Sequence, residues 1–379
     1  MHRNKNYRRH VRAGLASLAF IAAGLAAHAQ AQGSQTEPSA SAASRASTDP
    51  FVDPLDSPAV MQPQVAGRPV MAIARAGTRI VAVGMRGLIA ISDDEGRTWG
   101  QVGSPVRSDL LALSFPTALD GWVVGHDGVI LHTADGGRSW TRQFDGRMAA
   151  TTLVAYYKQK VADGDAALQP FLDQVTLNYN HGPSLPLLSV SFRDAQHGMA
   201  VGPFGMAIAT EDGGKSWRPV LDRIDNPQFL HLNAVLGQGA DLYLAAEKGT
   251  VFRLDAASGR FQAVNTGYAG SFFGMAGDEH ALYAFGLRGT IYGSSDRGAT
   301  WSPISSPLHG SVTSAMPLAS GHEVVFVTAA GEAALYDERT RAFRLVTLKH
   351  SSVLTGVLPL NHGELAITSL NGPAVVSTR

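Results

Sequence analysis

Residues 82–99 read AVGMRGLIAISDDEGRTW, and the same pattern returns at 123–140 (VVGHDGVILHTADGGRSW), 200–217 (AVGPFGMAIATEDGGKSW) and 284–301 (AFGLRGTIYGSSDRGATW). Small residues lead into Gly-x-x-Gly, an alternating segment follows, and Ser/Thr-x-Asp-x-Gly-x-Thr/Ser-Trp closes the unit. Three weaker copies occupy 244–261, 326–343 and 366–379. A fixed period of this length is typical of repeat architectures.

The second glycine of each copy sets the register of the repeat. It falls at Gly87, Gly128, Gly205, Gly249, Gly289, Gly331 and Gly372, with spacings of 41, 77, 44, 40, 42 and 41. The nearly doubled spacing predicts an insertion and not a lost repeat. Each unit contains four short strand candidates separated by turn residues, which indicates an all-β, seven-bladed β-propeller of four-stranded blades.

The last repeat stops after its third strand. We expect residues 51–66 to supply the missing fourth strand, which would clasp the termini and cover a sheet edge.

The insertion covers residues 146–185, where the β pattern breaks. Leu153, Tyr156, Tyr157 and Val161 fall on one helical face, and Leu168, Phe171, Leu172 and Val175 form a second at helical spacing. Two short amphipathic helices between blades 2 and 3 are therefore predicted, with Pro170 in the first turn of the second helix or kinking it. The pair is either packing on the propeller or a lid or docking element, and these interpretations are compatible.

The Asp motif is predicted to be a structural turn. Its Asp accepts backbone N–H bonds, its Gly takes a left-handed conformation, and its Trp is buried between sheets. The four acids lie in separate blades, which argues against a shared metal or catalytic site. The structural residues are Asp94, Trp99, Asp135, Trp140, Asp212, Trp217, Asp296 and Trp301.

This motif resembles the Asp-box, or bacterial neuraminidase repeat. The combination of Gly-x-Arg-Gly with the box, over residues 66–379, resembles the photosystem II stability/assembly factor family, in its bacterial non-photosynthetic branch. The arginine is kept in Gly84-Met85-Arg86-Gly87 and Gly286-Leu287-Arg288-Gly289, while other copies depart from it. The resemblance implies an exported propeller that helps to assemble a membrane complex, or an accessory protein of a resistance-nodulation-division type exporter.

A sialidase-like hydrolase or a carbohydrate-binding protein is the alternative, because sialidases share the box. The nearest match to a sialidase arginine motif is Phe252-Arg253-Leu254-Asp255, which lacks the proline. The segments expected innermost have almost no acids, whereas a glycosidase needs paired carboxylates. We therefore predict no catalytic residue. No histidine pair has a metal-ligand spacing, and we predict neither metal nor cofactor.

A partner-binding face is predicted where the hairpins between second and third strands meet the links between blades. Basic and aromatic side chains together make plausible contact residues. The predicted set is Arg86, Arg107, His126, Asp127, Phe204, His231, Lys248, Phe272, Arg288 and His309. A membrane protein or transporter complex of the cell envelope is the expected partner.

The amino terminus predicts export. A basic segment precedes an apolar run at 13–27 and small-residue cleavage sites, so residues 1–31 are expected to be a signal peptide and the mature protein to be periplasmic or otherwise exported, without a membrane span. Residues 32–60 are predicted to be a flexible linker and 61–379 the propeller.

Charge and cysteine content exclude some classes of function and site. The precursor has 31 basic and 31 acidic residues, and removing residues 1–31 takes away five basic residues and no acid, which leaves 26 against 31, a net charge of −5. That balance disfavours nucleic-acid binding. The absence of cysteine excludes disulfides, thiolate sites and lipidation at a cysteine.

Overall fold

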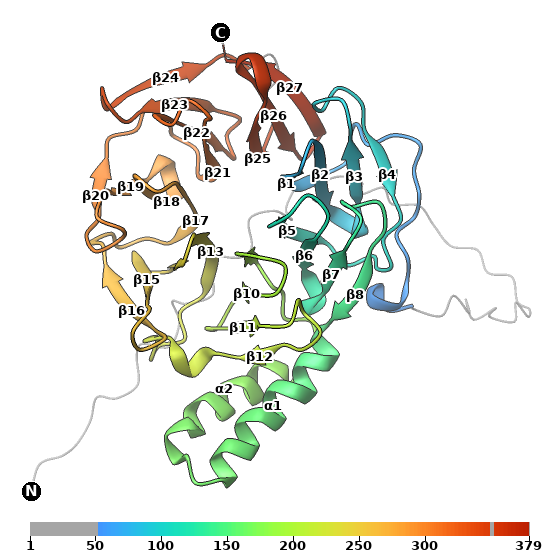
Figure 1. The fold of residues 1–379 in the computed structure, drawn as a ribbon, viewed down its shortest axis with the longest axis vertical. Helices are drawn as coiled ribbons and strands as arrows, with labels where there is room; N and C mark the ends of the chain where they lie inside the picture. Colours follow the sequence, from blue (N-terminus) through green and yellow to red (C-terminus); the bar gives the residue numbers. More distant parts are fainter. Residues whose placement is uncertain (1–51, 349–351, 379) are drawn as a thin grey trace, which may run out of the picture. The chain divides into compact units, whose positions relative to one another are not determined.

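The computed structural model describes residues 52–348 and 352–378. The signal peptide and most of the linker predicted above lie outside these residues. The described part of the chain forms a ring of antiparallel sheets, one per repeat (Figure 1). The predicted seven-bladed propeller is thereby confirmed.

Four strands run outward from the centre in each of the first six blades. Blade 1 contains β1 (Val70–Ala76), β2 (Arg79–Gly84), β3 (Ile89–Ser92) and β4 (Gly100–Val102); blade 2 contains β5 (Leu110–Ser114), β6 (Gly121–Gly125), β7 (Ile130–Thr133) and β8 (Thr141–Phe144); blade 3 contains β9 (Ser189–Phe192), β10 (Gly198–Val201), β11 (Ala207–Thr210) and β12 (Arg218–Pro219).

The second half of the ring repeats this order. Blade 4 contains β13 (Leu232–Gln238), β14 (Asp241–Ala246), β15 (Thr250–Asp255) and β16 (Arg260–Asn265); blade 5 contains β17 (Phe272–Gly277), β18 (Leu282–Gly286), β19 (Ile291–Ser294) and β20 (Ser302–Ile304); blade 6 contains β21 (Val312–Pro317), β22 (Glu323–Thr328), β23 (Ala333–Asp337) and β24 (Ala342–Val346); blade 7 contains β25 (Leu354–Pro359), β26 (Glu364–Ser369) and β27 (Gly372–Ser377).

The core lies between neighbouring blades, because each sheet buries both faces. The second strands of blades 1, 2 and 5 are buried along their whole length. One cluster joins Val70 and Ile80 of blade 1 to Leu358 and Ala366 of blade 7, so the ring closes through apolar packing.

Side-chain hydrogen bonds also link adjacent inner strands. Thr355 Oγ1 donates to Val70 O at 2.6 Å across the closing seam, and Thr313 Oγ1 donates to Leu354 O at 2.8 Å. Asn233 Nδ2 bonds Phe272 O at 2.8 Å in the same way. These contacts hold neighbouring blades in register around the centre.

Blade 7 differs from the expectation. Within the described residues its sheet has three strands, and residues 52–66 form no fourth one. Gly67 N donates to Asn371 O at 2.9 Å, beside the β26–β27 turn. Pro54, Pro58 and Pro63 interrupt the segment, and proline has no N–H for a strand ladder, which explains why the predicted strand does not form.

Residues 54–59 pack along blades 1 and 2 instead, whereas residues 63–66 lie beside β27 of blade 7 without forming a strand. A short 3-10 helix, η1 (Pro54–Asp56), buries Leu55, and Ala59 is also buried. Arg107 N donates to Pro54 O at 2.8 Å, and Ala59 N donates to Ser104 O at 3.0 Å. This part of the chain is therefore fixed to the link between the first two blades.

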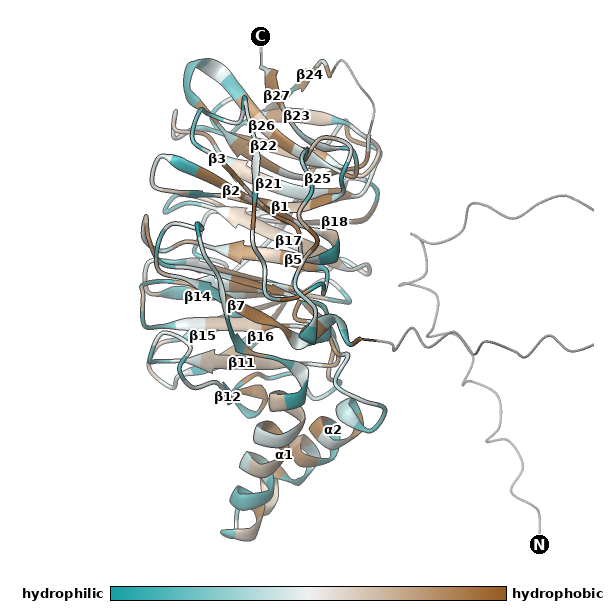
Figure 2. Ribbon diagram, turned by 90° about the vertical axis from the view of Figure 1, so that its right-hand side faces the viewer, coloured by the Kyte–Doolittle hydropathy of each residue, from teal (hydrophilic) through white to brown (hydrophobic). Residues whose placement is uncertain are grey.

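The predicted helical insertion is confirmed. Helix α1 (Gly146–Ala162) follows blade 2, and after the 3-10 turn η4 (Ala166–Leu168) helix α2 (Gln169–Tyr179) leads to blade 3. The pair projects beyond the ring (Figures 1 and 2). No helix among the described residues is long and apolar enough to cross a membrane.

Candidate functional site

The ring has two faces with different turns. Antiparallel order places the first–second and third–fourth strand turns on one face, which we call the Asp-box face. The second–third strand hairpins and the blade-to-blade links lie on the other, which we call the hairpin face. Its hairpins are at 84–88, 125–129, 202–206, 246–250 and 286–290, and its links are at 103–109, 225–231, 266–271 and 305–311.

The Asp-box closes on itself by hydrogen bonds. In blade 1, Asp94 Oδ1 accepts from Ser92 Oγ and from Thr98 N, both at 2.8 Å, while Oδ2 accepts from Thr98 Oγ1 at 2.6 Å. Gly96 N donates to Ser92 Oγ at 2.9 Å. Every oxygen of the carboxylate thus serves its own turn, and none is aimed at a ligand.

The same bonds lower the pKa of the box carboxylates. The pKa of Asp94 falls to about 2, first through the Thr98 hydroxyl and then through the Thr98 backbone N–H. Asp212 and Asp296 reach about 2 chiefly through Ser216 and Thr300. Asp135 reaches the same value although burial, its largest influence, opposes the shift. Each acid belongs to a separate blade, as predicted from the repeat.

The tryptophans of three boxes share one contact. Trp99, Trp140 and Trp301 donate from Nε1 to the carbonyl oxygen of the box glycine at 2.9–3.2 Å. Trp217 is buried like Trp140 and Trp301, whereas Trp99 is only partly buried. The Nε1 of Trp217 has no hydrogen-bond partner in the described part of the chain. The side chain of Gln143 lies beside Gly214. Its Oε1 accepts from Trp122 Nε1 and its Nε2 donates to Gly213 O, both at 3.0 Å.

The hairpins on the opposite face are left-handed turns. In blade 1, Arg86 has φ 56° and ψ 40°, Gly87 has φ 71°, and Leu88 N donates to Met85 O at 3.2 Å, which is type I′ geometry. The residue before the glycine that sets the repeat register takes positive φ in five of the seven blades. These residues are Arg86, Asp127, Phe204, Lys248 and Arg288.

That choice of residues is unusual for the turn. Gly, Asn and Asp are favoured there because a Cβ clashes in the left-handed region, at a cost of about 1–2 kcal/mol for other residues. Apart from Asp127, the turns use long or bulky side chains. The Asp-box face has the same conformation at Glu95, Arg297, Arg341 and His362, so strain alone does not distinguish the two faces.

Acidic side chains on the hairpin face are used to hold backbone N–H groups. Asp109 Oδ1 accepts from Arg86 N at 2.6 Å, and Glu247 accepts from His231 N at 2.9 Å. Glu332 accepts from Gly310 N at 2.8 Å and from His309 N. Asp127 accepts from Ser108 Oγ at 2.6 Å.

Basic groups on this face are less engaged. Within the described residues, the side chains of Arg86, Arg288 and His126 have no hydrogen bond or ion pair, and all three are exposed. The pKa of Arg68 is lowered, first by partial burial and then by the positive charge of neighbouring Arg86. These three cations therefore have no carboxylate partner among the described residues.

The remaining predicted cations make weaker contacts. Arg107 Nε donates to Pro58 O at 3.0 Å, Lys248 Nζ contacts Gln228 Oε1, and His309 Nδ1 lies 3.2 Å from Glu332. Phe204 is 45% exposed, and His231 is half-buried beside it. Nine of the ten predicted contact residues thus reach the surface of one face, at least in part.

Phe272 is a wrong prediction. Its side chain is fully buried against Tyr268 and Tyr292, and its neighbour Phe273 is 40% exposed. A bulge between Phe272 and Gly274 turns the first residue of the strand inward. Five other inner strands contain the same bulge and begin with a buried apolar residue, so aligning the strand starts across the repeats would have revealed it.

Met85 and Leu287 are surface residues of the hairpin face that the predicted contact set did not include. Each precedes the hairpin arginine and is 40% exposed, so apolar and cationic side chains alternate at these turns. The shared position in Gly-x-Arg-Gly was the available signal.

The helical insertion rises beside this face. Asp145 caps α1 by accepting from Arg147 N at 2.9 Å and Met148 N at 3.0 Å. Leu153, Tyr157 and Val175 are buried, and the pair projects beyond the edge of the ring next to β12 (Figure 2).

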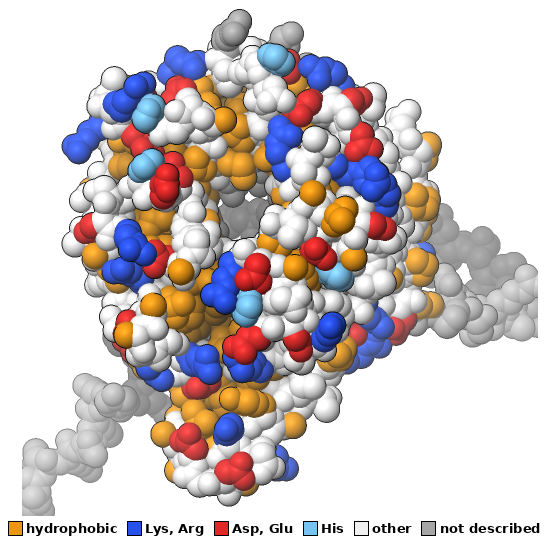
Figure 3. Space-filling view, in the orientation of Figure 1, with side chains coloured by type: hydrophobic (Ala, Val, Ile, Leu, Met, Phe, Trp, Pro, Cys, Tyr) orange, Lys and Arg blue, Asp and Glu red, His pale blue; other side chains and the backbone are white. Residues whose placement is uncertain are grey.

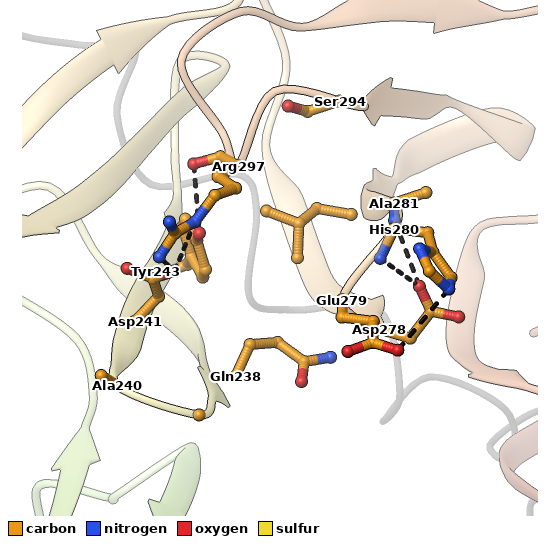
Figure 4. Close-up of a pocket in the computed structure, with 12 residues that line it drawn as sticks. Gln238, Ala240, Asp241, Tyr243, Asp278, Glu279, His280, Ala281, Ser294 and Arg297 are labelled. Atoms are coloured by element: carbon orange, nitrogen blue, oxygen red, sulfur yellow. Dashed lines mark hydrogen bonds and ion pairs between the residues drawn. The ribbon is translucent and has the colours of Figure 1, made fainter.

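The Asp-box face presents a different surface. Acidic and basic side chains stand next to one another along its rim, and hydrophobic side chains surround the central hollow (Figure 3). A pocket between blades 4 and 5 has Arg297 paired with Asp241 on one side, and on the other Asp278, which accepts from His280 N at 2.8 Å and Ala281 N at 3.1 Å (Figure 4). Its charged groups are engaged with one another or with the backbone.

The comparisons with known proteins agree with this architecture. Residues 71–157 match the family described as photosynthesis system II assembly factor YCF48. The chain is similar to "Photosystem II assembly lipoprotein Ycf48" of Synechococcus sp. (strain CC9902), with 23% identity over 241 residues that cover 58% of this chain and 70% of the relative.

Solved propellers share the fold. A YCF48 structure bound to a D1 peptide has a TM-score of 0.59 at 16% identity, covering 85% of this chain and 96% of the other. YCF48 from Cyanidioschyzon merolae has a TM-score of 0.60 at 15% identity, covering 83% and 96%. The WD40 propeller of Doa1, at 11% identity, has a TM-score of 0.56, covering 86% and 97%. Together with the repeats, these sequence matches show that the chain is similar to photosystem II assembly factors of the Ycf48 type, with which it shares the β-propeller fold.

Proposed function

We propose that the chain is an exported, non-catalytic assembly or accessory factor that binds an acidic protein segment of an envelope membrane complex on its hairpin face. One observation carries the proposal: the acids of that face hold backbone N–H groups, while Arg86, Arg288 and His126 stay unpaired within the described residues. Unpaired surface cations attract and orient an acidic partner.

The relatives support an assembly role. One is named a photosystem II assembly lipoprotein, and another was solved with a bound D1 peptide. A peptide bound by a propeller of the same fold supports a peptide-sized partner segment here. This chain has no cysteine, so it has no residue for lipid attachment at a cysteine, and the export signal predicted at 1–31 would deliver it to the periplasm.

The partner complex that we propose is a resistance-nodulation-division type exporter. A carbohydrate-active role has less support, because none of the seven inner strands contains Asp or Glu. The Phe252–Asp255 string lies on β15, with Phe252 buried. A glycosidase would need two carboxylates at the centre of the ring.

Affinity capture from cross-linked envelopes tests the proposal. Full-length protein should enrich a multi-span membrane protein, and the variant Arg86→Glu/Arg288→Glu should lose most of that enrichment. The control Arg339→Glu/Arg341→Glu reverses two exposed arginines on the Asp-box face and should retain it. Equal capture by both variants, or turnover of a fluorogenic sialoside, would contradict the proposal.

A further inference from the structure

Phe204 is a large aromatic residue that lies exposed on the hairpin face, and the packing of the propeller does not require it there. It occupies the left-handed position of the blade 3 hairpin with φ 56°, which is unfavourable for a bulky side chain. Its ring is 45% exposed and lies 4.7 Å from the His231 ring, centroid to centroid. The backbone of this hairpin is therefore strained at an aromatic residue whose side chain contributes little to the core.

A second strained phenylalanine lies on the adjoining link. Phe229 has φ 48° and packs edge-to-face on Phe171 of α2, with centroids 5.8 Å apart. The buried Asn226 fixes this link, since its side chain bonds Leu230 O at 3.0 Å and Leu230 N at 2.9 Å. Gly205 N donates to Leu230 O at 3.1 Å, which joins the link to the Phe204 hairpin.

The helical insertion is held rigidly against this link. Tyr157 of α1 is fully buried and donates its hydroxyl to Asp222 at 2.7 Å. The ring of Phe171 stacks 6.0 Å from that of Tyr157. The helices therefore form a fixed wall beside the link. We call Phe204, Phe229, His231 and Phe171 the aromatic corner.

The corner continues the cationic surface. Lys248 contacts Gln228 of the same link, and Glu247 is engaged by His231 N. Asp225 stands at the opposite end of the link and is exposed. If an acidic segment binds along the hairpins, the residues that follow its acidic side chains would contact the aromatic corner.

We propose that the aromatic corner anchors a large apolar side chain, preferably aromatic, of the acidic partner segment, with the helical insertion as one wall. This inference rests on the proposed function and names the chemistry of the segment: carboxylates for the hairpin cations and one aromatic residue for the corner. A buried aromatic anchor beside charged contacts is typical of interface hot spots.

Two fluorescein-labelled peptides, GDGEFDGEGD and GDGEADGEGD, test this with the full-length protein by fluorescence polarisation. Burying one phenylalanine should make the first bind about tenfold more tightly than the second. Phe204→Ala should remove that preference. The control Phe273→Ala, which truncates another exposed phenylalanine on the inner strand of blade 5, should keep it.

A shortened chain tests the role of the insertion. Gly146 Cα approaches Pro183 so closely that a Cβ on Gly146 would lie 1.8 Å from Pro183 O, so residues 147–182 can be replaced by a short glycine linker. If this variant unfolds, Phe171→Ala probes the same wall. Either variant should reduce the preference for the aromatic peptide.

The outcomes separate the two proposals. Equal binding of both peptides, weakened by Arg86→Glu/Arg288→Glu, would overturn the anchor and leave the acidic-segment function standing. Absence of binding by either peptide would contradict both. A preference that survives both Phe204→Ala and Phe171→Ala would also overturn the anchor.

Discussion

Arg341 and Arg288 occupy the same strained backbone conformation on opposite faces of the ring. Their φ angles are 55° and 53°, and both side chains are exposed. Elsewhere on the Asp-box face, in blade 1, charges pair with one another: Arg75 with Glu95 at 3.0 Å and Arg79 with Asp93 at 2.7 Å. On the hairpin face, Asp109, Glu247 and Glu332 accept from backbone N–H groups, and the side chains of Arg86 and Arg288 make no hydrogen bond or ion pair within the described residues.

Charge composition alone does not mark a binding surface. Both faces contain arginines, acids and left-handed turns, but the ion pairs Arg75–Glu95 and Arg79–Asp93 of the Asp-box face have no counterpart at the hairpin arginines Arg86 and Arg288 within the described residues. We therefore expect the Asp-box face to determine the stability of the fold and the hairpin face to determine binding.

The largest effect is expected from acid on the Asp-boxes. Their folded pKa near 2 lies below the ordinary 3.8, so the stability that they contribute is fully present above about pH 4 and is lost as pH falls toward 2. The urea midpoint should change little above about pH 4 and fall steeply between pH 4 and pH 2.5. Asp194 also has a pKa of about 2 and adds to this pH dependence of the stability.

Asp135→Asn isolates one box. This variant should be less stable at pH 7, because the amide cannot accept all the bonds from the turn, and its midpoint should vary less with pH. Partner capture by the folded protein should be unchanged. A midpoint that stays constant down to pH 2.5 in the wild type would contradict the structural account of the boxes.

A smaller effect is expected from relieving strain. Arg288→Gly and Arg341→Gly each remove a Cβ from a left-handed position and should raise the free energy of unfolding by about 0.5–1 kcal/mol, since relief of the clash exceeds the added flexibility of glycine in the unfolded chain. Urea unfolding measures this change.

The two glycine variants should differ in function. Arg288→Gly should weaken partner capture, and Arg341→Gly should not. If both are stabilised and both capture the partner normally, strain on the hairpin face has no connection with binding.

Much of the fold was predictable because each repeat encodes it locally. The Gly-x-x-Gly and Asp-box spacing gave seven blades, and helical periodicity at 153–175 gave the insertion. The fourth strand of blade 7 was not predicted correctly, because three prolines in 52–66 outweigh the general tendency of propellers to clasp their termini. Phe272 was misplaced because a bulge reverses the simple alternation of a strand.

The candidate site was predictable in position but not in electrostatics. Arg86 and Arg288 follow from the hairpin motif. The repeat does not predict the hydrogen bond from Arg86 N to Asp109, because Asp109 lies in a link outside the motif. Which charges remain unpaired depends on such contacts between segments.

Site-specific photo-crosslinking tests the central claim most directly. A photoreactive amino acid at Met85, Phe204 or Leu287 probes the hairpin face, and one at Leu119, which is 56% exposed in the first–second strand turn of blade 2, probes the Asp-box face. We predict crosslinks to one membrane protein from the three hairpin positions and none from Leu119. Crosslinks to that protein from Leu119 alone would contradict the assignment of the binding face.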